Sequence, residues 1–360
     1  MTSRLYSDLR LLVLRENWLG NTGLSAQDAF MALGALVESV SDADYMPITG
    51  RSAVLRMARR LITPALRKEY NRDVIRTARK LRPHLLVVFK GPHLEPATLL
   101  ELRSLGTRLF CFYPDVSYFE HGSLIPKALP LYDWIFTTKS FGLAELKRHF
   151  GIGSASFLPH AFDSRVHRPH LPHGELVKLF GAEASFIGSW SKKKERILED
   201  VRRERPNLRM RIWGNGWGNL SADSLLRPVT AFAALTGLAY SAAISCSRIN
   251  LAILFEGPAA SKQGDLITSR TFHIPASGGL MLHERTEDLL TYFQEDKEVV
   301  CFDSTEEMLA KIDWLLRDES ARERIAHAGR ECVLRSHSWE HRARTILDMY
   351  VAMGPATLNS

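Results

Sequence analysis

Several features are scarce in this 360-residue sequence, and each scarcity argues against a class of protein. The cysteines are few and far apart and form no CxxC pair, which argues against a disulfide framework and a zinc site; they are Cys111, Cys246, Cys301 and Cys332. The richest apolar run, residues 229–244, is too short and too often interrupted to span a membrane. The run 11–14 lies between Arg10 and Arg15 and is too brief for a signal peptide. We therefore expect a cytoplasmic protein.

Positive charge, by contrast, is concentrated in one segment. The net charge is +7, yet residues 51–82 hold eleven Arg or Lys against only Glu69 and Asp73, which gives this segment +9. One interpretation is solvated helix faces around an apolar stripe over residues 54–62, the commoner explanation for a run of charge. The other is a docking surface for an anionic partner, either a charged acceptor or the inner face of a membrane.

Continuous apolar runs alternate with helical patterns along the first 150 residues. They predict strands over 9–14, 85–89, 108–113 and 134–138, and helices over 25–40, 95–105 and 141–150. A glycine loop, residues 20–23, follows the first strand. Such alternation is typical of a doubly wound α/β domain with a parallel sheet.

Three prolines within 159–172 indicate a linker, after which the alternation begins again. We predict strands over 184–187, 209–213, 250–255 and 298–302, and helices over 192–203, 238–247, 305–317, 319–334 and from 339. The expected architecture is therefore two Rossmann-like domains that face a central cleft. Their ranges are 1–165 and 166–337, with a C-terminal helix and tail, 338–360, that could pack back on the first domain.

In the second domain, three turns follow predicted strands at the point where open parallel sheets bind ligands. They span 188–190, 214–217 and 268–279, and each contains glycine, which lets a backbone approach a ligand closely. Arg270 precedes the short helix of the third turn, where free backbone amides and a guanidinium together favour phosphate. The three turns predict a site for an anionic nucleotide.

These stretches also resemble a known family. Residues 185–189, 212–217, 240–254, 270–279 and 303–338 are similar to GT-B glycosyltransferases of the spore-maturation, CgeB-type group, which are relatives of the family-four glycosyltransferases. Residues 83–91, 113–115, 132–137 and the linker 158–163 match as well, so the resemblance covers nearly the whole chain. It implies a nucleotide-sugar donor held by the second domain, an acceptor held by the first, and transfer with retention. Fixed cations and amides can stabilise a leaving diphosphate without a metal, and we treat the DxD at Asp42-Ala-Asp44 as chance.

The resemblance also implies roles for individual residues. Gly188 and Ser189 would approach the diphosphate, with Lys194 or Arg196 as its counter-charge. Near the base and along the ribose and phosphates it implies Gly214, Asn215, Trp217, Arg270, Thr271, Gly278 and Gly279. His273 stands where the group usually has glutamate, and Asp265 stands where the wider family has its first glutamate. A neutral imidazole offers one acceptor nitrogen, so His273 would grip a ribose differently.

The first domain offers fewer candidates. Asp115 follows a predicted strand and is either a catalytic or acceptor-positioning carboxylate or a turn-forming residue after Pro114. We place Gly20, Asn21, Lys90 and His93 on the acceptor side. His121 and His160 also fall near strand ends or the junction, where a lone histidine is more often structural.

Glycosyl transfer to a glycan, lipid carrier, protein or small molecule is the leading functional prediction. A nucleotide-sugar epimerase or hydrolase would need paired carboxylates facing the sugar, and only Asp115 can be named. A basic module that binds nucleic acid or a membrane would rest on residues 51–82 alone and would leave the glycine turns unexplained. We expect no specific nucleic-acid partner and no metal cofactor.

Overall fold

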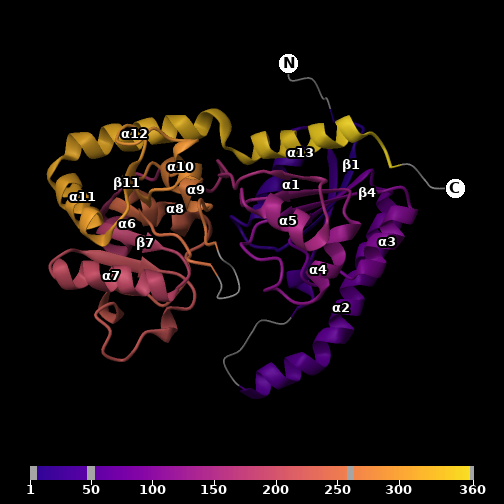
Figure 1. Ribbon diagram of the computed structural model, residues 1–360, viewed down its shortest axis with the longest axis horizontal. Helices are drawn as coiled ribbons and strands as arrows, with labels where there is room; N and C mark the ends of the chain where they lie inside the picture. The colour runs from indigo at the N-terminus through magenta and orange to yellow at the C-terminus, as the bar shows by residue number, and fades with distance from the viewer. Residues whose placement is uncertain (1–5, 47–52, 258–262, 357–360) are drawn as a thin grey trace. The chain divides into compact units, whose positions relative to one another are not determined.

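The computed structural model describes residues 6–46, 53–257 and 263–356 (Figure 1). The chain divides into two compact units. The first unit comprises Met1–Leu158 and Trp339–Ser360, and the second unit comprises Pro159–Ser338. The chain therefore leaves the first unit once and returns to it with its last helix.

The first unit is built on a six-stranded parallel sheet with the order β2-β1-β3-β4-β5-β6. The strands are β1 (Arg10–Arg15), β2 (Leu36–Ser41), β3 (Leu85–Phe89), β4 (Arg108–Tyr113), β5 (Trp134–Thr137) and β6 (Ala155–Phe157). All five residues of β3 are buried, as expected for a continuous apolar run in a sheet that is covered on both faces. The predicted strands 85–89 and 108–113 are confirmed residue for residue.

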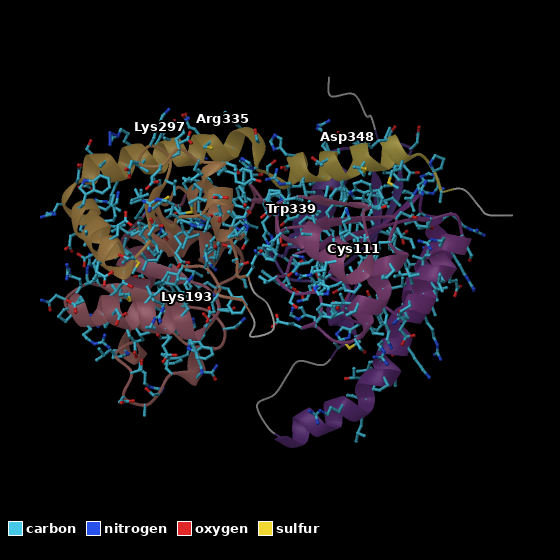
Figure 2. All side chains as sticks on the ribbon, viewed as in Figure 1. Cys111, Lys193, Lys297, Arg335, Trp339 and Asp348 are labelled. Carbon is cyan, nitrogen blue, oxygen red and sulfur yellow. The ribbon has the colours of Figure 1, made fainter. Side chains whose placement is uncertain are left out.

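Helices cover this sheet and enclose its core. They are α1 (Thr22–Ala32), α2 (Ala53–Leu81), α3 (Pro96–Ser104), α4 (Leu124–Ala128), α5 (Gly142–Phe150) and the returning α13 (Trp339–Met353). Helix α13 packs along α1 and places the Trp339 ring against Phe89 and Phe112, with ring centroids 6.1 and 5.5 Å away (Figure 2). A segment from the far end of the chain thus completes the core of the first unit.

The predicted helix over 25–40 is wrong in its second half. Helix α1 ends at Ala32, Gly34 takes the left-handed conformation with φ +102°, and β2 begins at Leu36. Strand β2 lies at the edge of the sheet and is only partly buried, so its sequence LVESVS lacks a continuous apolar run. Because β2 lacks such a run, the helical pattern of the preceding residues was wrongly continued to residue 40.

Helix α2 carries the basic segment, and its N-terminal part extends beyond the rest of the first unit (Figure 1). Leu61 is 77% exposed and Ile62 is exposed too, so these two members of the predicted apolar stripe are not buried. The side chains of its other members, residues 54–58, lie outside the described part of the chain. From Tyr70 onward the helix does bury one face, through Tyr70, Val74 and Ala78.

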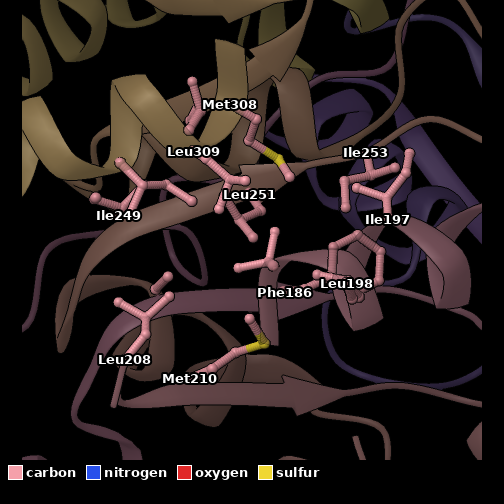
Figure 3. Close-up of a cluster of buried hydrophobic side chains, with 14 of the residues drawn as sticks. Phe186, Ile197, Leu198, Leu208, Met210, Ile249, Leu251, Ile253, Met308 and Leu309 are labelled. Carbon is pink, nitrogen blue, oxygen red and sulfur yellow. The ribbon is translucent and has the colours of Figure 1, made fainter. Parts of the chain in front are cut away.

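The second unit contains a five-stranded parallel sheet with the order β11-β10-β9-β7-β8. Its strands are β7 (Ala182–Ile187), β8 (Met210–Trp213), β9 (Ser247–Ala252), β10 (Met281–Glu284) and β11 (Val300–Phe302). Its helices are α6 (Gly174–Phe180), α7 (Lys192–Glu204), α8 (Gly237–Ser245), α9 (Arg270–Ala276), α10 (Glu287–Leu290), α11 (Thr305–Arg317) and α12 (Glu319–Ser336). Phe186, Leu251 and Met308 belong to the buried cluster between the sheet and its helices (Figure 3).

Both sheets reverse their strand order at one point. In the first unit the reversal lies between β1 and β3, and in the second between β7 and β9. Open parallel sheets bind ligands in the crevice outside the carboxyl ends of two such strands. The prediction of two doubly wound α/β units is therefore confirmed, and each unit has its own candidate crevice. In the described part of the chain, no helix has both the length and the apolar character to cross a bilayer.

Candidate functional site

At the carboxyl end of the second sheet, the turns that follow β7 and β8 are bonded to each other. The Gly188 amide donates to the Trp213 carbonyl at 2.9 Å, and the Trp190 amide donates to the Asn215 carbonyl at 2.8 Å. These bonds tie the two predicted turns 188–190 and 214–217 to each other. The indole Nε1 of Trp217 donates to the Gly188 carbonyl at 2.9 Å.

Two glycines permit this close approach of backbones. Gly214 has φ +147°, and a Cβ there would lie 2.0 Å from the Gly188 carbonyl oxygen. A Cβ on Gly188 would lie 2.7 Å from Arg270 Nη1 and 2.8 Å from the Phe186 ring. The first and third predicted turns therefore meet at Gly188 and Arg270.

Arg270, the first residue of α9, lies in the crevice between β7 and β9. Its Nη2 donates to the Ile253 carbonyl at 3.0 Å, and its guanidinium carbon lies 5.4 Å from the centre of the Phe186 ring. Burial lowers the pKa of Arg270. Its Nε is buried and has no hydrogen-bond partner in the described part of the chain. The guanidinium therefore keeps an unused donor next to a glycine turn.

Lys194 brings a second cation to the same place. Its side chain is 5% exposed, and Nζ donates to the Ser189 carbonyl at 3.1 Å and lies 5.4 Å from the centre of the Phe255 ring. Burial, together with the charge of Arg270, lowers the pKa of Lys194 to about 8. The two predicted cations thus come together from α7 and α9.

Two carboxylates at this edge were not predicted from the sequence. Glu256, just past β9, accepts hydrogen bonds from the Ser191 hydroxyl at 2.7 Å and from the Lys193 amide at 3.2 Å, at the start of α7. Burial opposes its ionisation, but the Ser191 hydrogen bond and its other partners outweigh burial and lower the pKa of Glu256. Glu284, the last residue of β10, pairs with Lys193 at 2.7 Å. The available sequence signal for Glu284 was its position at a strand end, but a single carboxylate at the end of a strand is common.

His273 lies one turn into α9 and is held among other rings. Its Nε2 lies 3.0 Å from the Ala161 carbonyl, and because a carbonyl only accepts, Nε2 carries the proton. The ring stacks on His167 with centroids 3.7 Å apart, and Tyr240 meets both imidazoles edge-on. Burial and the neighbouring His167 hold the pKa of His273 well below its usual value, so the imidazole is neutral.

Several predicted donor residues have other surroundings. Arg196 is exposed on α7 and lines an open depression of about 520 Å³, where three carboxylates (Glu195, Glu199 and Asp200) already balance its charge and those of Lys192 and Arg203. Trp217 is fully buried in the core, so its ring supports the Gly188 turn and presents no surface to a ligand.

Three residues near α9 face inward or away from the crevice. Thr271 is fully buried, and its hydroxyl lies 3.0 Å from His283 Nε2. Gly278 and Gly279 follow the C-terminal end of α9, at the opposite end of the helix from Arg270. Their hypothetical Cβ atoms would meet Pro169 at 3.2 Å and Ile244 at 2.5 Å. The structure therefore assigns them to helix–strand packing rather than to a phosphate contact.

At the carboxyl ends of β3 and β4, the first unit holds a smaller polar cluster. Lys90, just past β3, pairs with Asp115, just past β4, at 2.7 Å between Nζ and Oδ2. His121 Nε2 lies 3.0 Å from the same Oδ2. Burial opposes ionisation of Asp115, but the His121 hydrogen bond and the Lys90 charge outweigh it and hold its pKa far below the usual range. Asp115 is thus a permanently ionised carboxylate, which is a weak proton acceptor.

The other acceptor-side candidates in the first unit are backbone or capping elements. Asn21 is the N-cap of α1, and its side chain accepts from the Gly23 amide at 2.8 Å. Gly20 precedes it with φ +88°. The His93 carbonyl accepts from Asn71 Nδ2 at 2.9 Å. Asp42, from the DxD, follows β2, where burial and the nearby Glu16 raise its pKa to about 6. No group of three His, Cys, Asp or Glu within the described ranges could hold a metal ion.

Known proteins resemble this chain in part of its sequence and in its fold. Residues 192–348, a little under half of the chain, match the family model described as glycosyl transferase-like. A sequence comparison with curated proteins gives no match.

Solved structures resemble the fold over nearly the whole chain. Sucrose-phosphate synthase from Thermosynechococcus elongatus is 12% identical, with a TM-score of 0.66 over 96% of this chain and 99% of that one. HepE from Anabaena, solved in complex with UDP-glucose, is 10% identical, with a TM-score of 0.62 over 95% and 100%. A putative UDP-N-acetylglucosamine 2-epimerase from Listeria monocytogenes is 9% identical, with a TM-score of 0.54 over 94% and 95%. The chain therefore has the GT-B fold of glycosyltransferases and carries a glycosyl transferase-like region over residues 192–348.

Proposed function

We propose that the protein is a glycosyltransferase that moves a sugar from a nucleotide-diphosphate sugar, bound by the second unit, to an acceptor. The convergence of Arg270 and Lys194 in the crevice between β7 and β9 is the observation that carries this proposal. The glycosyl transferase-like match over residues 192–348 supports it independently.

Two neighbouring cations in a largely buried crevice are costly unless an anion joins them. Asp265 and Glu284 act electrostatically on Arg270, and Asp265 and Glu256 act on Lys194, so the pair is partly compensated. A diphosphate would add further negative charge and would accept the unused donor at Arg270 Nε. The glycine turn at Gly188 would let the phosphates approach backbone amides.

The same groups suit the chemistry of the transfer step. As the sugar–phosphate bond breaks, negative charge grows on the diphosphate, and fixed cations stabilise that charge without a metal ion. We propose metal-independent transfer with retention of configuration, and membership of the CgeB-type group, on the resemblance of the sequence. UDP-glucose in the HepE complex makes a UDP-sugar the first donor to test.

We also propose that the basic helix α2 meets an anionic acceptor or membrane surface. The exposed Leu61 and Ile62 lie on the same helix as the exposed Lys68 and Arg72, a combination that suits an anionic interface. A vesicle-sedimentation assay with and without phosphatidylserine tests the membrane contact, and equal sedimentation with both vesicle types would contradict it.

Donor binding can be tested with a panel of UDP-, GDP-, ADP- and TDP-sugars in a thermal-shift assay. A donor at a hundred times its dissociation constant should add about 2.7 kcal/mol of stability. Replacing Arg270 or Lys194 with alanine removes a charged hydrogen bond to phosphate and should weaken binding about 10- to 100-fold.

Arg196→Ala is the matched control, because Arg196 lies on α7 but lines the outer depression of mixed charge. It should leave donor affinity unchanged. If no nucleotide sugar raises the melting temperature, or if Arg196→Ala weakens binding as much as Arg270→Ala, the proposed donor site is wrong. Analysis of products separates transfer from epimerisation, since an epimerase would change the donor sugar without any acceptor.

A further inference from the structure

We propose that His283 and Glu284, the last two residues of β10, are positioning residues that hold Arg270 for the diphosphate of the donor. This inference rests on the proposed donor site and adds two side chains that act on the diphosphate only through Arg270. Strands β9 and β10 are parallel, so their carboxyl ends lie at the same edge of the sheet. Arg270 reaches that edge through its hydrogen bond to the Ile253 carbonyl.

The first connection runs from His283 to the start of α9. His283 is fully buried, and its Nδ1 lies 2.6 Å from the Glu284 carbonyl oxygen. Because a carbonyl only accepts, Nδ1 carries the proton. Burial lowers the pKa of His283 to about 4, so the ring is neutral at neutral pH and Nε2 is an acceptor. The hydroxyl of Thr271, 3.0 Å away, therefore donates to Nε2.

Thr271 carries this restraint to the backbone around Arg270. Its hydroxyl oxygen also accepts a hydrogen bond from the Thr268 amide at 3.1 Å. Thr268 and Thr271 lie on either side of Arg270 in the sequence, so one hydroxyl fixes the backbone turn that carries the guanidinium. Each member of this buried chain is held in one arrangement, because a polar atom left unpaired there would be costly.

The second connection runs from Glu284 through a single peptide group. Glu284 Oε2 accepts a hydrogen bond from the Leu254 amide at 2.5 Å. The carbonyl of that same peptide group, which belongs to Ile253, accepts from Arg270 Nη2 at 3.0 Å. A hydrogen bond to one side of a peptide group polarises it and strengthens the bond on the other side. The Glu284 carboxylate therefore supports the bond that orients Arg270.

The other oxygen of Glu284 reaches the helix that carries the second cation. Oε1 pairs with Lys193 Nζ at 2.7 Å, and Lys193 precedes Lys194 at the start of α7. The end of β10 thus contacts the starts of both α7 and α9, the two helices that supply the cations of the crevice. A site that is ordered before the donor arrives has less entropy to lose on binding.

Arg270 depends on this support because it has few contacts of its own. Within the described ranges, its one hydrogen bond is to the Ile253 carbonyl, and its Nε has no partner. No carboxylate of the described residues forms an ion pair with it. The guanidinium is therefore oriented through a neutral carbonyl, and its charge stays available to an anion.

Two pairs of variants test the two connections, with UDP affinity measured by calorimetry. Thr271→Val keeps the shape of the side chain but removes the hydroxyl that links His283 to α9, and Thr271→Ser restores it. Glu284→Leu removes both oxygens, and Glu284→Gln keeps one that can accept from the Leu254 amide. Thr271→Val and Glu284→Leu should each weaken UDP binding about 3- to 10-fold, and the serine and glutamine variants should lose less.

The position of Arg270 can also be measured without UDP. In protein labelled with ¹⁵N-arginine, the Nε resonance of Arg270 is identified by its absence from Arg270→Lys. This resonance should move in Thr271→Val and return toward its wild-type position in Thr271→Ser. A residue that only stabilised the fold would lower the melting temperature without this shift.

Ser247→Ala is the matched control. Ser247 is buried at the first residue of β9, the opposite end of the strand from Arg270, and its hydroxyl donates to the Ala243 carbonyl at 2.7 Å. Its loss should leave UDP affinity and the Arg270 resonance unchanged.

Wild-type behaviour of Thr271→Val or Glu284→Leu in both measurements would overturn the role of the connection that the variant tests. A loss of UDP affinity in Ser247→Ala or Thr271→Ser as large as that in Thr271→Val would overturn the proposal too, since any buried change would then have the same effect. A wild-type protein that does not bind UDP would instead contradict the proposed donor site, and the Arg270 resonance alone would then decide whether His283 and Glu284 position the guanidinium.

Discussion

At the scale of single residues, the charge of Lys194 changes within an accessible pH range. Its pKa of about 8 means that the free protein loses this charge as the pH rises through 8. A diphosphate favours the protonated form, so UDP affinity should fall as the pH rises above 8, approaching tenfold per pH unit for one linked proton. Lys194→Arg keeps its charge and should make UDP affinity nearly constant between pH 7 and 9 by calorimetry. An equally steep loss in Lys194→Arg would show that another group controls binding.

His273 is constrained by its own hydrogen bond, and this changes what a glutamate would do there. A carboxylate at 273 would face the Ala161 carbonyl with no proton to donate, next to the His167 ring. We expect His273→Glu to lower the free energy of unfolding by about 1–3 kcal/mol in urea denaturation, as for a buried acceptor left unpaired. His273→Gln keeps a donor and should lose less. Equal stability of the glutamate variant and the wild type would refute this account.

The sequence predicted Arg270 and Lys194 as donor ligands, and the structure brings these two together. It could not choose between Lys194 and Arg196, because both follow the same strand. Residues two apart on a helix point about 200° apart, so only one of them can face the crevice. That choice depends on the orientation of α7, which is set by Ile197, Leu198 and Val201 in the core.

At the scale of elements, the turn after β7 depends on the absence of a side chain at Gly188. A methyl group there would push Arg270 Nη1 and the Phe186 ring, both under 3 Å from the hypothetical Cβ. The Arg270 guanidinium would have to move away from its observed position to make room for the methyl group. Gly188→Ala should therefore weaken UDP binding about 3- to 10-fold. Calorimetry provides the measurement.

Gly174→Ala is the matched control for that turn. Gly174 starts α6 in the same unit, and a Cβ there would meet nothing within 4 Å. It should bind UDP as the wild type does. Unchanged affinity in Gly188→Ala would mean that ligands do not use the space beside Arg270.

In the first unit, the central strands were predicted well and the two edge strands were not. Strand β3 has an unbroken apolar sequence and β4 has one after Arg108, whereas β2 and β6 are edge strands with partly exposed residues and escaped prediction. The predicted strand over 250–255 begins and ends three residues after β9, because the apolar run continues beyond the paired residues. Periodicity reports burial, and burial extends past the hydrogen-bonded ladder here.

At the scale of the whole molecule, the last helix is a structural part of the first unit. Trp339→Ala removes a buried ring between Phe89 and Phe112 and should lower the stability of that unit by about 3–5 kcal/mol. Differential scanning calorimetry should record this loss as a lower melting temperature for the first unit. Val351→Ala, at a site 60% exposed on the same helix, should have little effect. If both variants have the same melting temperature, the buried face of α13 does not stabilise the core of the first unit.

The boundary between the two units could be located only approximately from the sequence. Prolines within 159–172 indicated a junction, and the structure divides the chain at Leu158, rather than at residue 165, and again at Ser338. The approach of Lys90, Asp115 and His121 was not predicted, since it depends on the loop that follows β4. Ion pairs of this kind arise from three-dimensional packing and leave no fixed spacing in the sequence.

Helix α13 belongs to the first unit but follows the second unit in the sequence. The first unit therefore cannot complete its fold until the second unit has been synthesised. When residue 158 has been made, the surface around Phe89 and Phe112 has no partner until Trp339 emerges. At 5–20 residues per second, that delay is on the order of ten to forty seconds. During this interval the second unit can fold completely while the nascent first unit exposes an apolar face, which makes the early product a natural client for chaperones.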